Sequence, residues 1–142
     1  FSACKELDDT EYKKDRKAFF SSIHGTLNHL LVVDRAYISR IEGIDHGLKS
    51  LDQILFESLL QLEEARIKED KRLIDLVNSL SEESIHKEIT YKGFETGNTT
   101  YTINILLITL FNHQTHHRGQ IHNMLSQAGI KPPQIDIPDF IE

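Results

Sequence analysis

The chain has 142 residues, of which 39% are hydrophobic and 27% are charged, and its formal net charge is -6 at pH 7. This length fits one domain, residues 1–142, and the composition differs from that of disordered chains. The negative charge disfavours nucleic acid as a partner, because binding to phosphates depends on excess Lys and Arg. Cys4 is the single cysteine, and no apolar run approaches the roughly 18 residues of a membrane span. We therefore expect no membrane contact and a cytoplasmic location.

The spacing of apolar residues predicts three helices in the first 80 residues. The first is a short helix over residues 1–7, followed by a break and a new helix cap at Asp8, Asp9 and Thr10. The second covers residues 18–42 and stops at Gly43; its apolar positions are Phe19, Ile23, Leu27, Leu30, Val33, Tyr37 and Ile41. The third covers residues 48–80, with Leu51, Ile54, Leu55, Leu59, Leu62, Ile67, Leu73, Leu76 and Val77.

A different pattern occupies residues 85–101. The segments 88–91 and 99–102 are rich in β-branched and aromatic residues and are separated by Gly93, Gly97 and Asn98, which indicates a short β-hairpin or an ordered loop. A last helix then starts near residue 102 or 104 and ends at Ala128, because Gly129 is a typical helix stop. The predicted fold is all-α, a four-helix bundle whose first helix is short, with the hairpin or loop before the last helix.

The last predicted helix carries an unusual polar patch. On a helical wheel, its apolar residues share one arc about 100° wide; His117 and Gln114 lie inside that arc, and His113 lies at its edge. Buried imidazole and amide groups destabilise a fold unless they find partners. Two histidines four residues apart project from one face and can reach the same metal ion. His116 is displaced toward the polar side but competes as an alternative ligand, and Gln120 shares the face of the pair.

The second predicted helix supplies two further candidates. His29 lies at the edge of its apolar arc and could be a third metal ligand. Asp34 lies inside the arc, where an unpaired carboxylate is unfavourable, so it needs a partner such as Arg118 or the second nitrogen of a ligand histidine. Three imidazoles with an open position are typical of a catalytic site, but a core of hydrogen-bonded histidines also fits this spacing.

Two blocks of the sequence resemble the DinB family of damage-inducible bacterial proteins, which is unrelated to the DNA polymerase of the same name. The blocks are residues 19–35, FFSSIHGTLNHLLVVDR, and residues 111–120, FNHQTHHRGQ. The resemblance implies a four-helix bundle in which His29, His113 and His117 bind one divalent metal ion, usually zinc or nickel. It selects His117 over His116, because the last ligand of the family directly precedes the Arg-Gly-Gln segment.

The chain departs from the family pattern in two places. Members of the family begin with a further stretch of first helix ahead of the position of Phe1, and Tyr37 replaces a common Trp, which bears on the floor of the pocket. The candidates for supporting the ligands or lining a pocket are Asp34, Tyr37, Gln114 and Gln120.

The resemblance leaves three functions open. Relatives include transferases and isomerases that use bacillithiol, mycothiol or glutathione, which implies a metal-dependent thiol S-transferase or a hydrolase acting on a small molecule. The alternative is a non-catalytic metal-binding protein of the stress response. The third is a purely structural helical dimer, and the resemblance also implies a homodimer for the enzyme.

Overall fold

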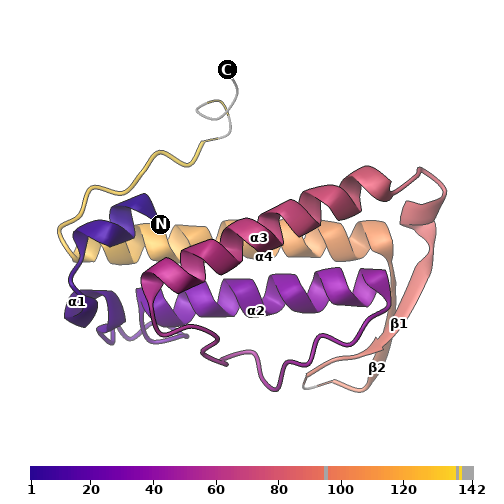
Figure 1. Cartoon of the computed structure of the whole chain (residues 1–142), viewed down its shortest axis with the longest axis horizontal. Helices are drawn as coiled ribbons and strands as arrows, with labels where there is room; N and C mark the ends of the chain where they lie inside the picture. Colours follow the sequence, from indigo (N-terminus) through magenta and orange to yellow (C-terminus); the bar gives the residue numbers. More distant parts are fainter. Residues whose placement is uncertain (95, 137, 139–142) are drawn as a thin grey trace.

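A computed structural model of the chain describes residues 1–94, 96–136 and 138. It confirms the mostly helical bundle with a two-stranded hairpin before the last helix (Figure 1). Two short 3-10 helices, η1 and η2, cover Ser2–Glu6 and Ser84–His86. The α-helices are α1 (Asp9–Lys13), α2 (Ile23–Glu42), α3 (Leu59–Ser79) and α4 (Ile103–Gln127), and the strands are β1 (Glu88–Lys92) and β2 (Asn98–Thr102).

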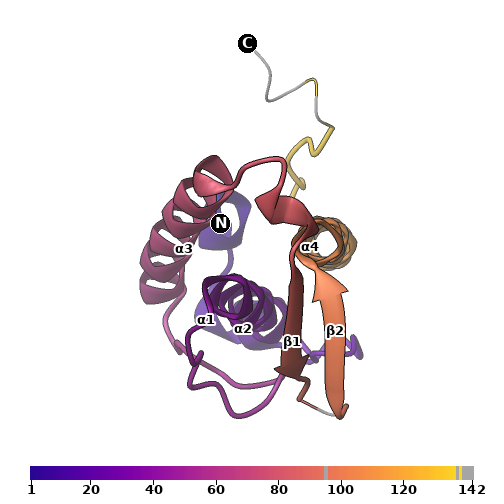
Figure 2. The same ribbon diagram turned by 90° about the vertical axis from the view of Figure 1, so that its right-hand side faces the viewer.

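Helices α2 and α4 lie side by side and run in opposite directions, and α3 crosses them on one side (Figures 1 and 2). The hairpin lies at the end of the bundle where α2 stops and α4 starts. The largest apolar cluster fills the opposite end, where residues of α2, α3 and α4 pack together with Cys4 and Tyr12. Its buried members from the long helices are Ile23, Leu27, Leu30, Leu31, Leu62, Ala65, Ile121, Met124 and Leu125.

The start of α2 differs from the prediction, which placed it at residue 18. The helix begins at Ile23, because Lys17 and Ser21 have positive φ angles of 58° and 62° that no α-helix accommodates. Ser22 is the N-cap, and its side chain accepts a hydrogen bond from the backbone of Gly25. Phe19 was therefore wrongly assigned to the apolar face of a helix, and its ring is 87% exposed.

The third helix also begins later than predicted, at Leu59 rather than residue 48. Residues 44–58 form a long irregular connection that returns along α2, so that α3 begins at the same end of the bundle as α2 (Figure 1). Polar side chains of α2 fix this connection. Asn28 accepts hydrogen bonds from the backbone N–H groups of Leu55 and Phe56, and His24 bonds the carbonyl of Phe56. These bonds replace those that a helix would have made.

The hairpin and α4 agree with the prediction. The strands pair antiparallel from Glu88 opposite Thr102 to Lys92 opposite Asn98. Helix α4 starts directly after β2, and its buried residues are those of the predicted apolar arc, His117 among them. In the part of the chain that the structure describes, no helix has both the length and the apolar character that crossing a bilayer requires.

Candidate metal centre

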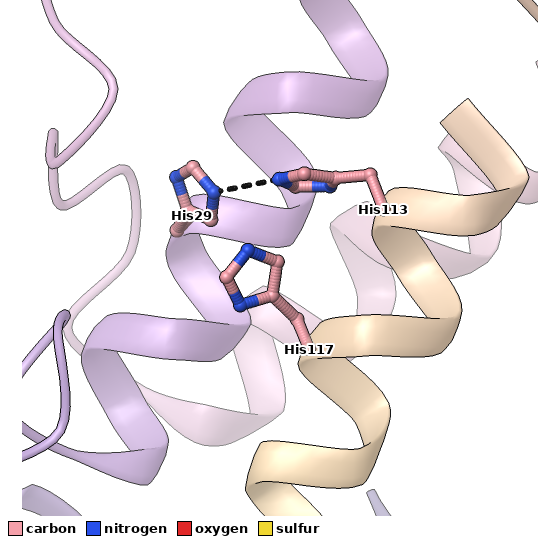
Figure 3. A group of neighbouring side chains, drawn as sticks. All are labelled: His29, His113 and His117. Carbon is pink, nitrogen blue, oxygen red and sulfur yellow. Dashed lines mark hydrogen bonds between the residues drawn. The ribbon is translucent and has the colours of Figure 1, made fainter. Parts of the chain in front are cut away.

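The three predicted histidines meet between α2 and α4 (Figure 3). His29 projects from the middle of α2, and His113 and His117 project from successive turns of α4. One ring nitrogen of each lies within 4.8 Å of those of the other two. His29 Nε2 and His113 Nε2 are 3.0 Å apart. Two nitrogens bound to one tetrahedral zinc ion at normal bond lengths are roughly 3.3 Å apart, so this spacing suits a shared ion.

Hydrogen bonds orient two of the rings. Nδ1 of His29 lies 2.8 Å from the carbonyl oxygen of Leu51, and Nδ1 of His117 lies 2.7 Å from Oε1 of Gln120. Both oxygens can only accept, so each Nδ1 carries the proton and donates it. The lone pair of each neutral ring then resides on Nε2. Leu51 belongs to the 44–58 connection, which gives that connection a direct role in the site.

Burial keeps all three rings neutral at pH 7. Burial, with a smaller contribution from nearby imidazoles, lowers the pKa of His29 to about 4 and that of His113 to about 3, although the hydrogen bond to the Leu51 carbonyl acts in the opposite direction on His29. Burial also lowers the pKa of His117, although the hydrogen bond to Gln120 acts in the opposite direction. Since an imidazole binds a metal ion only when it is neutral, the triad is in the ligand form without any need to lose protons.

Two observations limit the ligand set. Over residues 1–94, 96–136 and 138, no further His, Cys, Asp or Glu joins the group of His29, His113 and His117. His116, the alternative ligand, is exposed, and its Nε2 lies 3.1 Å from the amide nitrogen of Gln120 instead. The buried Nδ1 of His113 has no hydrogen-bond partner within the described residues, so this ring is paired only through its Nε2, which lies 3.0 Å from Nε2 of His29.

Asp34 belongs to a different polar cluster, five residues further along α2 from His29. Its carboxylate is fully buried and pairs with the Arg66 guanidinium from α3, and it accepts a hydrogen bond of 2.8 Å from the Gln114 amide of α4. Burial raises the pKa of Asp34, and the Arg66 charge and the Gln114 amide oppose this shift. The predicted partners of Asp34 were therefore wrong: Arg118 is exposed and its nearest acceptors are on α4 itself.

The remaining predicted residues separate into different locations. Gln120 contacts the triad through His117, whereas Gln114 supports Asp34. Tyr37 packs against the buried cluster of Ile38, Leu73 and Leu110. Sequence reasoning missed Phe20, whose ring stacks on His29 with centroids 3.7 Å apart.

A cavity of about 310 Å³ lies beside the triad rather than on it. Gln114 and Arg118 of α4 and Arg66 of α3 line its polar part, and residues such as Leu27 and Leu30 line its apolar part. None of the three histidines is among its lining residues. Gln114 thus contacts both the cavity and the Asp34 carboxylate.

Comparison with known proteins places this geometry in context. A family model described as "DinB family" matches residues 1–142. The Protein DinB of Bacillus subtilis (strain 168) is 30% identical over 138 residues, which cover 91% of this chain and 77% of that protein. The crystal structure of a DinB-like protein from Bacillus cereus ATCC 10987 superposes with a TM-score of 0.69 at 20% identity, covering 95% of this chain and 87% of that one. At this identity the last match supports the fold alone.

Proposed function

The chain belongs to the DinB family, and on that premise we propose that it is a metal-dependent enzyme whose His29, His113 and His117 hold one divalent ion. Zinc and nickel are the proposed metals, because both accept neutral imidazole ligands. The observation that carries the proposal is the convergence of three neutral rings from two helices, with two of them hydrogen-bonded at Nδ1 so that the lone pair lies on the inward Nε2.

Three protein ligands leave at least one coordination position for an exogenous group, which is the arrangement of catalytic rather than structural zinc sites. A bound ion supplies the chemistry of a Lewis acid: it lowers the pKa of a coordinated thiol or water near neutral pH. The residues of the chain do the rest. Leu51 and Gln120 hold the Nδ1 protons of two ligands, and the low-dielectric interface of α2 and α4 excludes bulk water from the rings.

Over residues 1–94, 96–136 and 138, no cysteine or carboxylate joins the three histidines as a protein nucleophile. Cys4, the single cysteine of the chain, is buried and does not belong to the histidine group. We therefore propose that the nucleophile is brought by a small molecule, a low-molecular-weight thiol for S-transfer or water for hydrolysis. In the transfer reaction, the thiol sulfur forms a bond to an electrophilic carbon, a group such as chloride leaves, and the thiol proton passes to solvent.

A screen of the zinc- or nickel-loaded protein tests this proposal. Bacillithiol, mycothiol and glutathione are offered with a chlorinated aromatic compound or an epoxide, and product formation is compared between wild type and His117→Ala. We expect a rate that depends on the metal and is lost in the variant. Equal rates for the two proteins would exclude the triad from the reaction.

One observation favours a second function, a non-catalytic metal-binding protein of the stress response. The 310 Å³ cavity is not lined by any of the three histidines, so the triad does not open into it. A protein that binds one ion with high affinity but is inactive with every thiol and electrophile would support this alternative.

We also propose that the protein is a cytoplasmic homodimer. Leu60, Ile67 and Ile74 lie seven residues apart on α3 and are 60%, 62% and 59% exposed. This spacing gives an apolar stripe along one side of the helix, which suits packing against the same stripe of a second copy. Sedimentation of wild type and Ile67→Glu tests the proposal, and a monomeric wild type would contradict it.

A further inference from the structure

Phe20 covers one side of the histidine triad. Its half-buried ring stacks on His29 with an interplanar angle of 18° and a centroid distance of 3.7 Å. The same ring meets His117 edge-on, with centroids 5.6 Å apart. One aromatic side chain therefore contacts two of the three proposed ligands, and no other phenylalanine or tyrosine of the described residues stacks on them.

The backbone that carries Phe20 has an unusual conformation. Residues 14–22 connect α1 to α2, and we call them the 14–22 loop. Two of them, Lys17 and Ser21, adopt positive φ angles, and the N–H of Arg16 donates to the carbonyl of Ser21 at 2.7 Å. The Arg16 side chain is 6% exposed and pairs with Glu11 of α1 at 2.9 Å, which fixes the base of the loop. The turn is thus held from both ends.

Gly25 allows the loop to approach the helix. A Cβ atom at this position would lie 2.1 Å from the carbonyl oxygen of Phe20, a distance that no real Cβ contact reaches. Gly25 is four residues before His29 and so lies on the same side of α2. Glycine inside a helix is unfavourable relative to alanine, and here it permits the contact that brings Phe20 onto the His29 ring.

Phe19 provides an internal comparison. It precedes Phe20 in the same loop and packs edge-on against it, with centroids 4.8 Å apart, but its own ring is 87% exposed. Neither His29 nor His117 is among its aromatic partners. The two adjacent rings therefore differ in whether they cover the triad, while they share the loop.

We propose that Phe20 is a gate of the histidine triad: the ring limits how fast a metal ion and its exogenous ligand enter and leave, and exchange requires displacement of the 14–22 loop. The proposal rests on the metal site proposed above. Packing against His29 also restricts rotation of that imidazole, whose Nδ1 is already held by the Leu51 carbonyl. Phe20 thereby acts as a positioning residue for one ligand and as a barrier for the ion.

The rate of zinc release tests the gate. The zinc-loaded full chain is mixed with a saturating chromophoric chelator in a stopped-flow instrument, and wild type is compared with Phe20→Ala, Phe20→Leu and Phe19→Ala. We expect release to accelerate about 10- to 100-fold in Phe20→Ala, which corresponds to the loss of a buried aromatic contact. Phe20→Leu keeps apolar bulk over the His29 ring, so its rate of zinc release is expected to remain within about tenfold of the wild-type rate. Phe19→Ala is expected to release zinc at the wild-type rate.

The outcomes separate the gate from the metal site. A wild type that takes up no zinc would overturn the proposed function. Normal uptake with equal release rates in wild type and Phe20→Ala would overturn the gate alone. Equal acceleration in Phe19→Ala and Phe20→Ala would also overturn it, because the effect would then come from a loosened loop rather than from the covering ring. Urea denaturation of each metal-free variant distinguishes faster release from global unfolding.

Discussion

Two polar clusters lie a few residues apart in the same interface between α2 and α4. They differ in how their buried polar groups are accommodated. In one, the Asp34 carboxylate is paired with Arg66 and receives a hydrogen bond from Gln114. In the other, His29, His113 and His117 turn ring nitrogens toward one another, and burial keeps the rings uncharged.

The difference shows which cluster has its charge paired within the protein. Arg66 reaches the Asp34 cluster from α3, so three helices contribute and the charges balance within the protein. The triad donates hydrogen bonds from two outward nitrogens, to the Leu51 carbonyl and the Gln120 side chain, and its inward Nε2 atoms of His29 and His113 lie 3.0 Å apart. A metal ion can accept several of these inward lone pairs at once. The first cluster thus stabilises the bundle, and the second is suited to binding.

The largest effect on stability is expected from the paired cluster. Arg66→Ala leaves Asp34 buried without its counter-charge, so the free energy of unfolding should fall by about 3–5 kcal/mol in urea denaturation. Arg118→Ala is the control, because this exposed side chain does not pair with Asp34; it should change stability by less than about 0.5 kcal/mol. A comparable loss in both variants would contradict the assignment of Arg66.

The triad predicts a pH dependence of the metal-free protein. The pKa of His29 falls from 6.5 in the unfolded chain to about 4 in the fold. Below pH 6.5 His29 binds a proton in the unfolded chain but not in the folded chain. The contribution of His29 to the free energy of unfolding is therefore fully present above pH 6.5 and decreases as the pH falls toward 4. His29 contributes at most about 3 kcal/mol to this loss. Urea denaturation at several pH values should show a weaker dependence in His29→Gln, and an identical one would refute the shift.

Variants of two glutamines on α4, Gln114 and Gln120, test the two clusters separately. Gln120→Leu removes the acceptor of the His117 Nδ1 proton and should weaken zinc binding about 10- to 100-fold in competition titrations. Gln114→Leu removes the donor to Asp34 and should leave zinc affinity unchanged, while it lowers stability by about 1–3 kcal/mol. The interpretation fails if the two variants exchange these effects.

The smallest effect is expected at His116. Its ring is exposed and contacts Gln120 rather than the inward nitrogens of the triad. His116→Ala should therefore weaken zinc binding by less than about tenfold, below the range for losing a residue that orients a ligand. Loss of binding in this variant, with retention in His117→Ala, would reverse the assignment of the third ligand.

The sequence was sufficient for the helical bundle, because the bundle depends on local periodicity. It left a hairpin and an ordered loop both open before the last helix, and it left His116 as an alternative to His117. It identified His29 only as a candidate, and the family resemblance joined it to the pair. The partner of Asp34 could not be predicted, since Arg66 lies 32 residues away in the sequence, on a helix whose start was wrongly placed.

The loops were the main failure. Residues 48–58 have helical spacing, but their backbone groups bond to Asn28 and His24 of α2, and this competition cannot be read from periodicity. Phe20 was hidden for a similar reason, since the predicted helix began at residue 18. Gly25 carried the missed signal, because a glycine inside a predicted helix often marks a close approach of another segment.

Metal analysis of the protein tests the central claim most directly. Wild type and the alanine variants of His29, His113 and His117 are stripped with a chelator, reloaded with zinc or nickel, desalted and analysed by mass spectrometry for bound metal. We expect one ion per chain in wild type and a strongly reduced content in each variant. A wild type that retains neither metal, or variants that retain as much as wild type, would contradict the account.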